Sequence, residues 1–215
     1  MPFTFSHPAA VLPLLGRGSW VAAGLVAGAM APDVPFFAES VLRGSYRYGG
    51  LTHRWWAVPT VDVVIAGAAA AWWYGVVRPE RRSAAPLGWF ALSAAVGAGT
   101  HVLWDSFTHE GRWGVRVLPV LDTRVAGVPL HTVLQYGTSL LGLAALAPHR
   151  SALGRVTPGA AAVLTAAAAA GALHRLARHE RGRIDELCFG AGTGAALGAT
   201  LLGALRRSAP AGRRP

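Results

Sequence analysis

The stretch Gly99-Thr100-His101-Val102-Leu103-Trp104-Asp105-Ser106-Phe107-Thr108-His109 continues an almost wholly apolar run over residues 87–99. Three candidate metal ligands recur in it at every fourth residue: His101, Asp105 and His109. On a helix, residues four apart lie one above another on the same face. Imidazole and carboxylate groups held in this way can share a divalent cation, and zinc is the usual metal for mixed nitrogen and oxygen ligands. The alternative is a helix end whose polar groups hydrogen-bond one another. The apolar flank favours a metal, because ionisable residues inside membrane-grade helices are costly and usually functional.

The composition indicates a membrane protein. Hydrophobic residues make up 53% of the 215 residues and charged residues only 14%, against roughly 25% charged residues in soluble domains. All 20 basic residues are arginine, which is typical of a GC-rich genome. The net charge of +10 does not indicate nucleic-acid binding, since the arginines stand in short gaps between apolar segments and not on one basic-aromatic face. Arginine in such gaps is typical of membrane proteins, so we expect an integral protein of a bacterial plasma membrane with membrane lipid as its partner.

Apolar segments of spanning length determine the fold that we expect. Five of them follow a polar loop at residues 39–59 and cover about 60–77, 87–105, 129–147, 157–173 and 186–205. Each has roughly 17 to 20 residues, close to the length that crosses a bilayer. Two shorter apolar stretches within residues 7–33 predict a helical hairpin. The sequence therefore predicts an all-α, polytopic transmembrane bundle in one domain over residues 1–205, with an N-terminal hairpin, about five spanning helices and a basic disordered tail at 206–215.

This topology gathers the histidines on one side of the membrane. Because each spanning segment carries the chain across, the gaps between segments alternate between the two sides. All but one of the 8 histidines then share a side, and only His149 lies opposite. The candidate ligands on the shared side are, in chain order, His7, Asp33, His53, His101, Asp105 and His109, with His131 and Gln135 as weaker members. The single cysteine, Cys188, excludes an intramolecular disulfide and a cysteine-based zinc site.

Several motifs resemble the DUF4184 family. They are the opening Pro2-Phe3-Thr4-Phe5-Ser6-His7-Pro8-Ala9, the turn Met30-Ala31-Pro32-Asp33, the string from Thr100 to His109, and the segment from Pro129 to Tyr136 with Ser139-Leu140-Leu141-Gly142. The resemblance covers most of residues 2–145. The chain is also distantly similar to inner-membrane metal-dependent hydrolases of the DUF457 group, which carry a similar early histidine, a Pro-Asp turn, a histidine-bearing loop and a His-x3-Asp helix.

The order of the candidate ligands is similar to that of the all-helical zinc-dependent phospholipase C and P1-type nuclease superfamily. By that resemblance, one metal is held by Asp33, His53, His101 and Asp105, and a second uses His7 and shares Asp105. A third metal would use His109 and His131. Gln135 stands where the superfamily has a glutamate, so the third site lacks its carboxylate.

The chemistry expected of such a centre is hydrolysis of a phosphoester in a lipid or lipid-linked substrate. A divalent metal, with zinc expected, lowers the pKa of a coordinated water and polarises a phosphoryl or acyl oxygen. We expect Asp105 and His101 to be catalytic, and Arg54 or Arg112 to bind the substrate phosphate. The open alternatives are a non-enzymatic membrane protein with a structural polar or metal site, and a cation pathway. Segments 60–77 and 157–173 hold few polar residues, which counts against transport.

Overall fold

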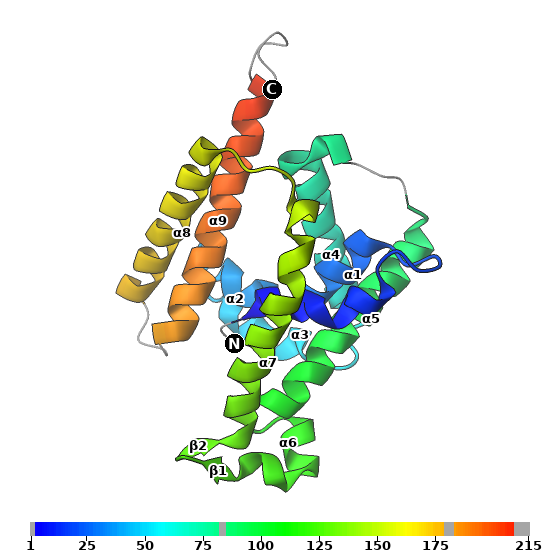
Figure 1. Cartoon of the computed structure of the whole chain (residues 1–215), viewed down its shortest axis with the longest axis vertical. Helices are drawn as coiled ribbons and strands as arrows, with labels where there is room; N and C mark the ends of the chain where they lie inside the picture. Colours follow the sequence, from blue (N-terminus) through cyan, green and yellow to red (C-terminus); the bar gives the residue numbers. More distant parts are fainter. Residues whose placement is uncertain (1–2, 82–84, 179–182, 209–215) are drawn as a thin grey trace.

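Each of the five predicted apolar segments forms a helix in the computed structural model, which describes residues 3–81, 85–178 and 183–208 (Figure 1). The described chain is all-α except for one two-stranded sheet. The five helices are α4 (Val61–Trp72, continued by the π-helical turn Trp73–Val77), α5 (Leu87–Thr108), α7 (Leu130–Leu146), α8 (Pro158–Arg178) and α9 (Arg183–Ser208).

Three of these helices, not about five, are long and apolar enough to cross a membrane: α5, α8 and α9. The prediction of about five spanning helices is therefore wrong in number for the described residues. The apolar helix over Val61–Val77 stays below 18 residues, and 17 residues rise only about 26 Å against a hydrocarbon core of about 30 Å. Helix α7 also has 17 residues, and it carries His131, Gln135 and Thr138. The segment lengths read from the sequence did not separate the helices of spanning length from the shorter ones.

The predicted N-terminal hairpin is present as two short helices of different kinds. The first is a 3-10 helix, η1 (Thr4–Leu14), which packs on α1 (Ala22–Met30). Pro8 and Pro13 lie inside η1 and lack the N–H groups that an α-helical ladder needs, which favours the tighter 3-10 form. The turn η2 (Ala31–Asp33) then leads directly into the short helix α2 (Val34–Ala38). This turn places Asp33 at a fixed corner of the chain.

Small residues bring α1 very close to α5. A Cβ added to Gly28 would overlap the carbonyl of Ala94, and one added to Gly97 would overlap the carbonyl of Leu25. Close approach through glycine and alanine is the usual packing of membrane helices, because it maximises van der Waals contact between the backbones. It brings the backbone of α1 within hydrogen-bonding distance of side chains on α5.

Helices α8 and α9 pair in the same way. Gly190, Gly194 and Gly198 recur every four residues on α9 and face Gly171 and Ala167 of α8 so closely that a Cβ on Gly194 would overlap the Ala167 carbonyl. Only 11% of the apolar window of α8 is buried, as expected for a helix whose outer face meets lipid. Small residues on both helices therefore allow the close approach of α8 and α9.

One buried ion pair ties this helical hairpin to the rest of the molecule. Arg175 of α8 and Glu186 of α9 are both almost fully buried, and the Arg175 Nε donates to Glu186 Oε2. The Arg175 Nη1 also donates to the Phe36 carbonyl, at 2.8 Å, and so binds the hairpin to α2. Helix α9 continues to Ser208, so the predicted tail begins later than residue 206, and residues 209–215 lie outside the described part of the chain.

The segment between α5 and α7 forms a small extension at one end of the molecule (Figure 1). It holds α6 (Trp113–Val117) and the antiparallel pair β1 (Arg124–Val125) and β2 (Val128–Pro129). The two-residue turn between the strands has positive φ at both positions, 50° at Ala126 and 83° at Gly127, as a type I′ hairpin requires. The short helix α3 (Gly49–Thr52) lies in the predicted polar loop, follows the 3-10 turn η3 (Ser45–Tyr48) and ends directly before His53. Further 3-10 turns are η5 (Pro79–Arg81), η6 (Pro119–Asp122) and η7 (Ala147–Leu153).

Candidate metal centre

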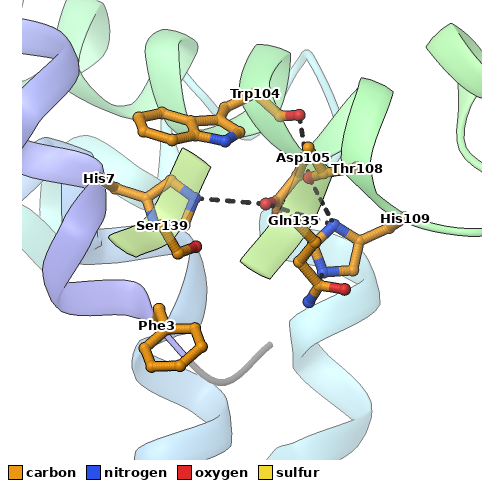
Figure 2. Close-up of a pocket in the computed structure, with 8 residues that line it drawn as sticks. All are labelled: Phe3, His7, Trp104, Asp105, Thr108, His109, Gln135 and Ser139. Carbon is orange, nitrogen blue, oxygen red and sulfur yellow. Dashed lines mark hydrogen bonds and ion pairs between the residues drawn. The ribbon is translucent and has the colours of Figure 1, made fainter. Parts of the chain in front are cut away.

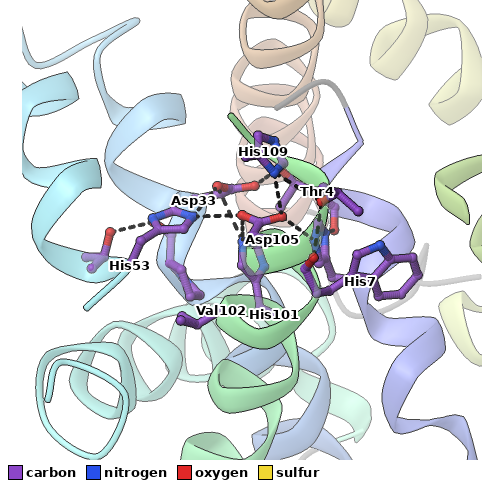
Figure 3. Close-up of polar contacts among 12 residues, drawn as sticks. Thr4, His7, Asp33, His53, His101, Val102, Asp105 and His109 are labelled. Carbon is purple, nitrogen blue, oxygen red and sulfur yellow. Dashed lines mark hydrogen bonds and ion pairs between the residues drawn. The ribbon is translucent and has the colours of Figure 1, made fainter. Parts of the chain in front are cut away.

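Four of the predicted ligands meet at one buried point (Figure 3). They are Asp33 at the end of η2, His53 just after α3, and His101 and Asp105 one turn apart on α5. Each offers a nitrogen or oxygen atom, and the four atoms all lie within 4.8 Å of one another. No more than 5% of any of these residues is exposed. We call this group the inner centre.

The spacing of these atoms fits a bound zinc ion. Asp33 Oδ1 lies 3.4 Å from His53 Nε2 and 3.6 Å from His101 Nε2. Asp105 Oδ2 lies 3.1 Å from His53 Nε2 and 3.3 Å from His101 Nε2. Ligands at the usual zinc distances of about 2.0–2.1 Å in a tetrahedron stand about 3.3–3.4 Å apart. These four distances are thus close to four of the six edges of a zinc tetrahedron.

Hydrogen bonds on the side away from the inner centre orient its ligand side chains. The Nδ1 atoms of His53 and His101 lie 2.7 Å from the Gly49 carbonyl and 2.8 Å from the Ala29 carbonyl. A carbonyl only accepts, so each Nδ1 carries a proton, and in the neutral ring each Nε2 presents a lone pair to the centre. Thr4 donates its hydroxyl to Asp33 Oδ2, which leaves Oδ1 to face the centre. Such supporting hydrogen bonds are typical of metal sites.

Two ligand atoms of the inner centre have no hydrogen-bond partner within the described residues. They are Asp33 Oδ1 and His101 Nε2, and both are fully buried. An unsatisfied buried polar atom typically costs about 1–3 kcal/mol, so such atoms need an explanation. A divalent ion at the common point would satisfy both, and the donor set of two imidazoles and two carboxylates is one that zinc accepts. The residues present therefore fit a metal.

The second oxygen of Asp105 faces two further histidines. Asp105 Oδ1 lies 3.3 Å from His7 Nε2 and 3.4 Å from His109 Nδ1. The His7 ring stacks on the His101 ring with centroids 3.8 Å apart. We call His7, His109 and this oxygen of Asp105 the outer centre. Asp105 therefore lies between the two groups, with one oxygen directed at each.

The outer centre opens into a narrow pocket (Figure 2). Its volume is about 10 Å³, roughly the least space that holds one water molecule. Gln135 lies beside it, and its side-chain amide is 2.9 Å from His109 Nε2. The atom in contact is the Gln135 amide nitrogen Nε2, which only donates, so His109 Nε2 accepts from it and the neutral ring carries its proton on Nδ1. Turning the Gln135 amide by 180° would reverse these roles and free the Nδ1 lone pair that faces Asp105. Gln135 then orients His109 and does not itself face Asp105.

The charges of this cluster shift the pKa values of its members outside the long helices. Burial acts to raise the pKa of Asp33, but the nearby charges of His101 and His53 outweigh it and hold the pKa well below its usual value. Burial acts to lower the pKa of His53, but the hydrogen bond with Asp105 and the charge of Asp33 raise it above its usual value. The pKa of His109 falls to about 4, chiefly through burial, so this ring is neutral at pH 7, the form that binds metals.

The other predicted site residues lie further from Asp105. His131 is buried, but its Nε2 faces Asp122 Oδ1 at 3.6 Å. Arg54 is exposed and lines neither pocket near the centre. Arg112 is half-buried, and its charge helps to lower the pKa of His109. Arg112 follows His109 by three residues and acts on that ring through its charge, and a phosphate-binding role for either arginine stays a prediction.

Two buried polar residues near the cluster were missed from the sequence. Thr4 hydrogen-bonds Asp33 across 29 residues, and a lone threonine near a chain end carries no signal of that contact. Asp62, in the first turn of α4, is fully buried, and neither of its carboxyl oxygens has a hydrogen-bond partner in the described structure. Burial raises the pKa of Asp62 to about 6 against the opposing charges of His53 and His101. Its only sequence signal, a carboxylate beginning an apolar segment, is also that of an ordinary helix start.

The chain belongs to the family described as domain of unknown function DUF4184, whose model matches residues 1–172. The match includes both centres and ends within α8, so α9 lies beyond it. No curated protein and no solved structure gives a significant match. The description of the family names no activity, and the function must be inferred from the site.

Proposed function

We propose that this chain is a membrane-embedded hydrolase that holds two divalent metal ions, zinc in the first instance, and cleaves a phosphoester bond in a lipid or lipid-linked substrate. The observation that carries the proposal is the position of Asp105. Its two carboxylate oxygens face two different sets of ligands, 3.1–3.3 Å from His53 and His101 and 3.3–3.4 Å from His7 and His109. A carboxylate between two cation sites is the arrangement that two-metal phosphoesterases use.

The two centres differ in a way that suggests different roles. The inner centre has four protein ligands, all buried, which leaves no open position in a tetrahedral site, as in structural zinc sites. The outer centre has three protein groups and adjoins the narrow pocket. Three protein ligands with an open position are typical of catalytic zinc sites. We assign catalysis to the outer centre and charge balance and rigidity to the inner one.

A bound metal would lower the pKa of a coordinated water and polarise the phosphoryl oxygen. The protein groups hold that chemistry in place. Asp105 supplies negative charge to both centres, and its position is set by four surrounding imidazoles. Gln135 fixes the orientation of His109. Arg112, close enough to lower the pKa of His109, is the cation best placed to bind a substrate phosphate.

The helices that surround the site are the reason for proposing a membrane location. Helix α5 has spanning length, and it carries His101 and Asp105 in its last two turns. If α5 crosses a bilayer, these residues lie near one surface, at the depth of lipid phosphates. Exposed Trp55 and Trp56, beside His53, suit the same level, because tryptophan favours the interface. We propose the bacterial plasma membrane as the location.

Metal analysis of detergent-purified protein tests the proposal directly. We expect two equivalents of metal per chain after supply of Zn²⁺ or Mn²⁺, together with release of phosphate or a phosphorylated head group from mixed-micelle phospholipids. The release should stop with a chelator and return with metal. Protein that binds no stoichiometric metal under these conditions would rule the hydrolase out.

A structural metal site is the second candidate. The closed geometry of the inner centre favours it, since that centre could hold η2, α3 and α5 together without any reaction. This candidate predicts one metal per chain, a large loss of thermal stability on chelation, and no phosphoesterase activity. The metal stoichiometry separates the two candidates before any substrate is known.

A further inference from the structure

Asp62 is a buried carboxylate that belongs to neither metal centre. It stands in the first turn of α4, and the other residues of that helix are apolar or glycine. The residue is fully buried, and neither carboxyl oxygen has a hydrogen-bond partner in the described structure. A carboxyl in such a place destabilises the fold, because burial removes its water and no protein group replaces it. An aliphatic residue would avoid this cost, so the carboxyl needs an explanation.

The usual role of an acidic residue at a helix start does not explain Asp62. In that role the carboxylate accepts from free N–H groups of the first turn, or lies near the surface in the field of the helix dipole. Asp62 accepts from no N–H group and is not exposed. Its own N–H donates to the Ala57 carbonyl at 3.0 Å, so that group is satisfied without a side chain. The dipole alone is too weak to offset complete burial.

The position of Asp62 connects it with the inner centre. Helix α4 packs on η2, which ends with Asp33, and on α5, which carries His101 and Asp105. The charges of His53 and His101, both members of the inner centre, act on the Asp62 carboxyl. Asp62 is not among the four residues whose ligand atoms lie within 4.8 Å of one another. It therefore lies near the inner centre but outside its set of ligands.

The charge of a two-metal cluster gives a reason for a third carboxylate. Two dications bring four positive charges into the buried site. Asp33 and Asp105 offset only two of them, since histidine binds metal as the neutral ring. The remaining positive charge is costly where water is excluded, and a bound cation favours the ionised form of a nearby carboxyl.

The other buried carboxylates already have partners. Within the described residues, Glu39 accepts from the Tyr46 N–H at 2.8 Å, and Glu186 pairs with Arg175. Asp62 is thus the buried carboxylate of the described chain that remains to offset the charge of the metals.

We infer that Asp62 is the third carboxylate of the metal cluster, whose negative charge tightens metal binding from outside the set of ligands. Asp62 is then a positioning residue and not a ligand. The inference rests on the two-metal centre of the proposed function, and it adds a residue that neither the ligand order nor the coordination geometry identifies.

Competition between a chelator and the detergent-purified full chain for Zn²⁺ tests the inference. At pH 8 we expect Asp62→Asn to bind Zn²⁺ about 10–100-fold more weakly than wild type, with two equivalents still bound at saturating metal. Zinc X-ray absorption should give the same coordination number in both proteins. Glu80→Gln, at an exposed carboxylate paired with Arg78, should bind Zn²⁺ as wild type does.

Thermal unfolding of the metal-free proteins distinguishes a charge effect from damage to the fold. Without metal, the Asp62 charge is buried and unpaired at pH 8, above its pKa of about 6. Metal-free Asp62→Asn should therefore have a higher Tm than metal-free wild type, although it binds metal more weakly. A residue that merely supports the fold would lower both quantities together.

The outcomes separate this inference from the proposed function. A wild type with two metals and an Asp62→Asn variant of equal affinity overturn the third carboxylate and leave the two-metal centre standing. Weaker binding together with a lower metal-free Tm, or with a lower coordination number, also overturns it, because Asp62 would then support the fold or bind the metal directly. A wild type that holds one metal or none removes the excess charge and overturns both. Two metals with the expected effects of Asp62→Asn, but no hydrolysis of any lipid, support the inference and count against the hydrolase.

Discussion

Replacing Asp105 with asparagine is the change that the structure predicts to be most damaging to metal binding. The amide keeps the shape of the side chain but removes the charge that both oxygens direct at the four surrounding histidines. Loss of a supporting group around a metal typically lowers affinity about 10–100-fold, so loss of a shared carboxylate should lower it at least about 100-fold at each centre. Asp105→Asn protein should therefore lose both metals.

The stability change follows from linkage. Free metal at 100 times the wild-type Kd stabilises the folded state by about 2.7 kcal/mol per site, and a 100-fold weaker site leaves only about 0.4 kcal/mol. At about 2–4 °C per kcal/mol for a chain of this length, each lost site lowers Tm by about 5–9 °C. The measurements are metal content by mass spectrometry and thermal unfolding in detergent, at matched free metal.

Matched variants show whether the two centres are separate. Asp33→Asn should lose only the inner metal, because Asp33 contacts His53 of the inner centre. His109→Ala should lose only the outer metal, because His109 contacts the Asp105 oxygen of the outer centre. His149→Ala, at an exposed histidine outside the cluster, should keep both. An Asp105→Asn protein that retains one equivalent refutes the shared carboxylate, and one that retains two refutes the assignment of these residues to metal.

Four further changes test other parts of the structure. Thr4→Val removes the hydroxyl that Asp33 Oδ2 accepts and should weaken the inner metal about 10–100-fold in a chelator competition, with stoichiometry unchanged at saturating metal. In metal-free protein, the lowered pKa of Asp33 stabilises the folded state above pH 3.8, the usual pKa of an aspartate, and the raised pKa of His53 stabilises it below pH 6.5, the usual pKa of a histidine. Unfolding scans should therefore show the greatest stability between pH 3.8 and 6.5. The stabilisation given by added metal should grow as pH rises, because metal binding displaces protons from the ligands. Asp62→Asn removes a carboxyl whose pKa burial raises to about 6. In the wild type, ionisation of this buried carboxyl lowers the free energy of unfolding by up to about 3 kcal/mol as the pH rises from about 4 to 8. The metal-free variant should not show this loss. Gly194→Ala should destabilise by about 1–3 kcal/mol through overlap with the Ala167 carbonyl, whereas Gly137→Ala, with open space at its Cβ position, should be neutral or stabilising by up to about 1 kcal/mol in an unfolding assay.

Local regularities made much of the site predictable. The relation of His101, Asp105 and His109 depends only on helical periodicity, which places residues four apart on one face whatever surrounds them. The apolar composition and the positions of the apolar segments likewise predicted an all-α fold, because hydrophobicity and segment length are properties of the chain alone.

The number of spanning helices could not be derived in this way. Helices α4 and α7 match spanning segments in sequence, but each apolar helix has only 17 residues in the structure. Whether an apolar helix meets lipid or protein depends on its neighbours, and hydropathy does not report them.

The division of the ligands between two centres was decided by tertiary structure alone. His7 and Asp105 are 98 residues apart, and which oxygen of Asp105 His7 meets depends on how η1 packs against α5. The carbonyls of Ala29 and Gly49 that orient His101 and His53 carry no sequence signal, since every residue has a carbonyl. The pairing of Arg175 with Glu186, which holds the C-terminal hairpin on α2, is equally invisible in a chain with many arginines. A sequence thus determines which groups are available for chemistry, while their distances and partners follow from long-range packing, because packing energy depends on contacts that periodicity does not encode.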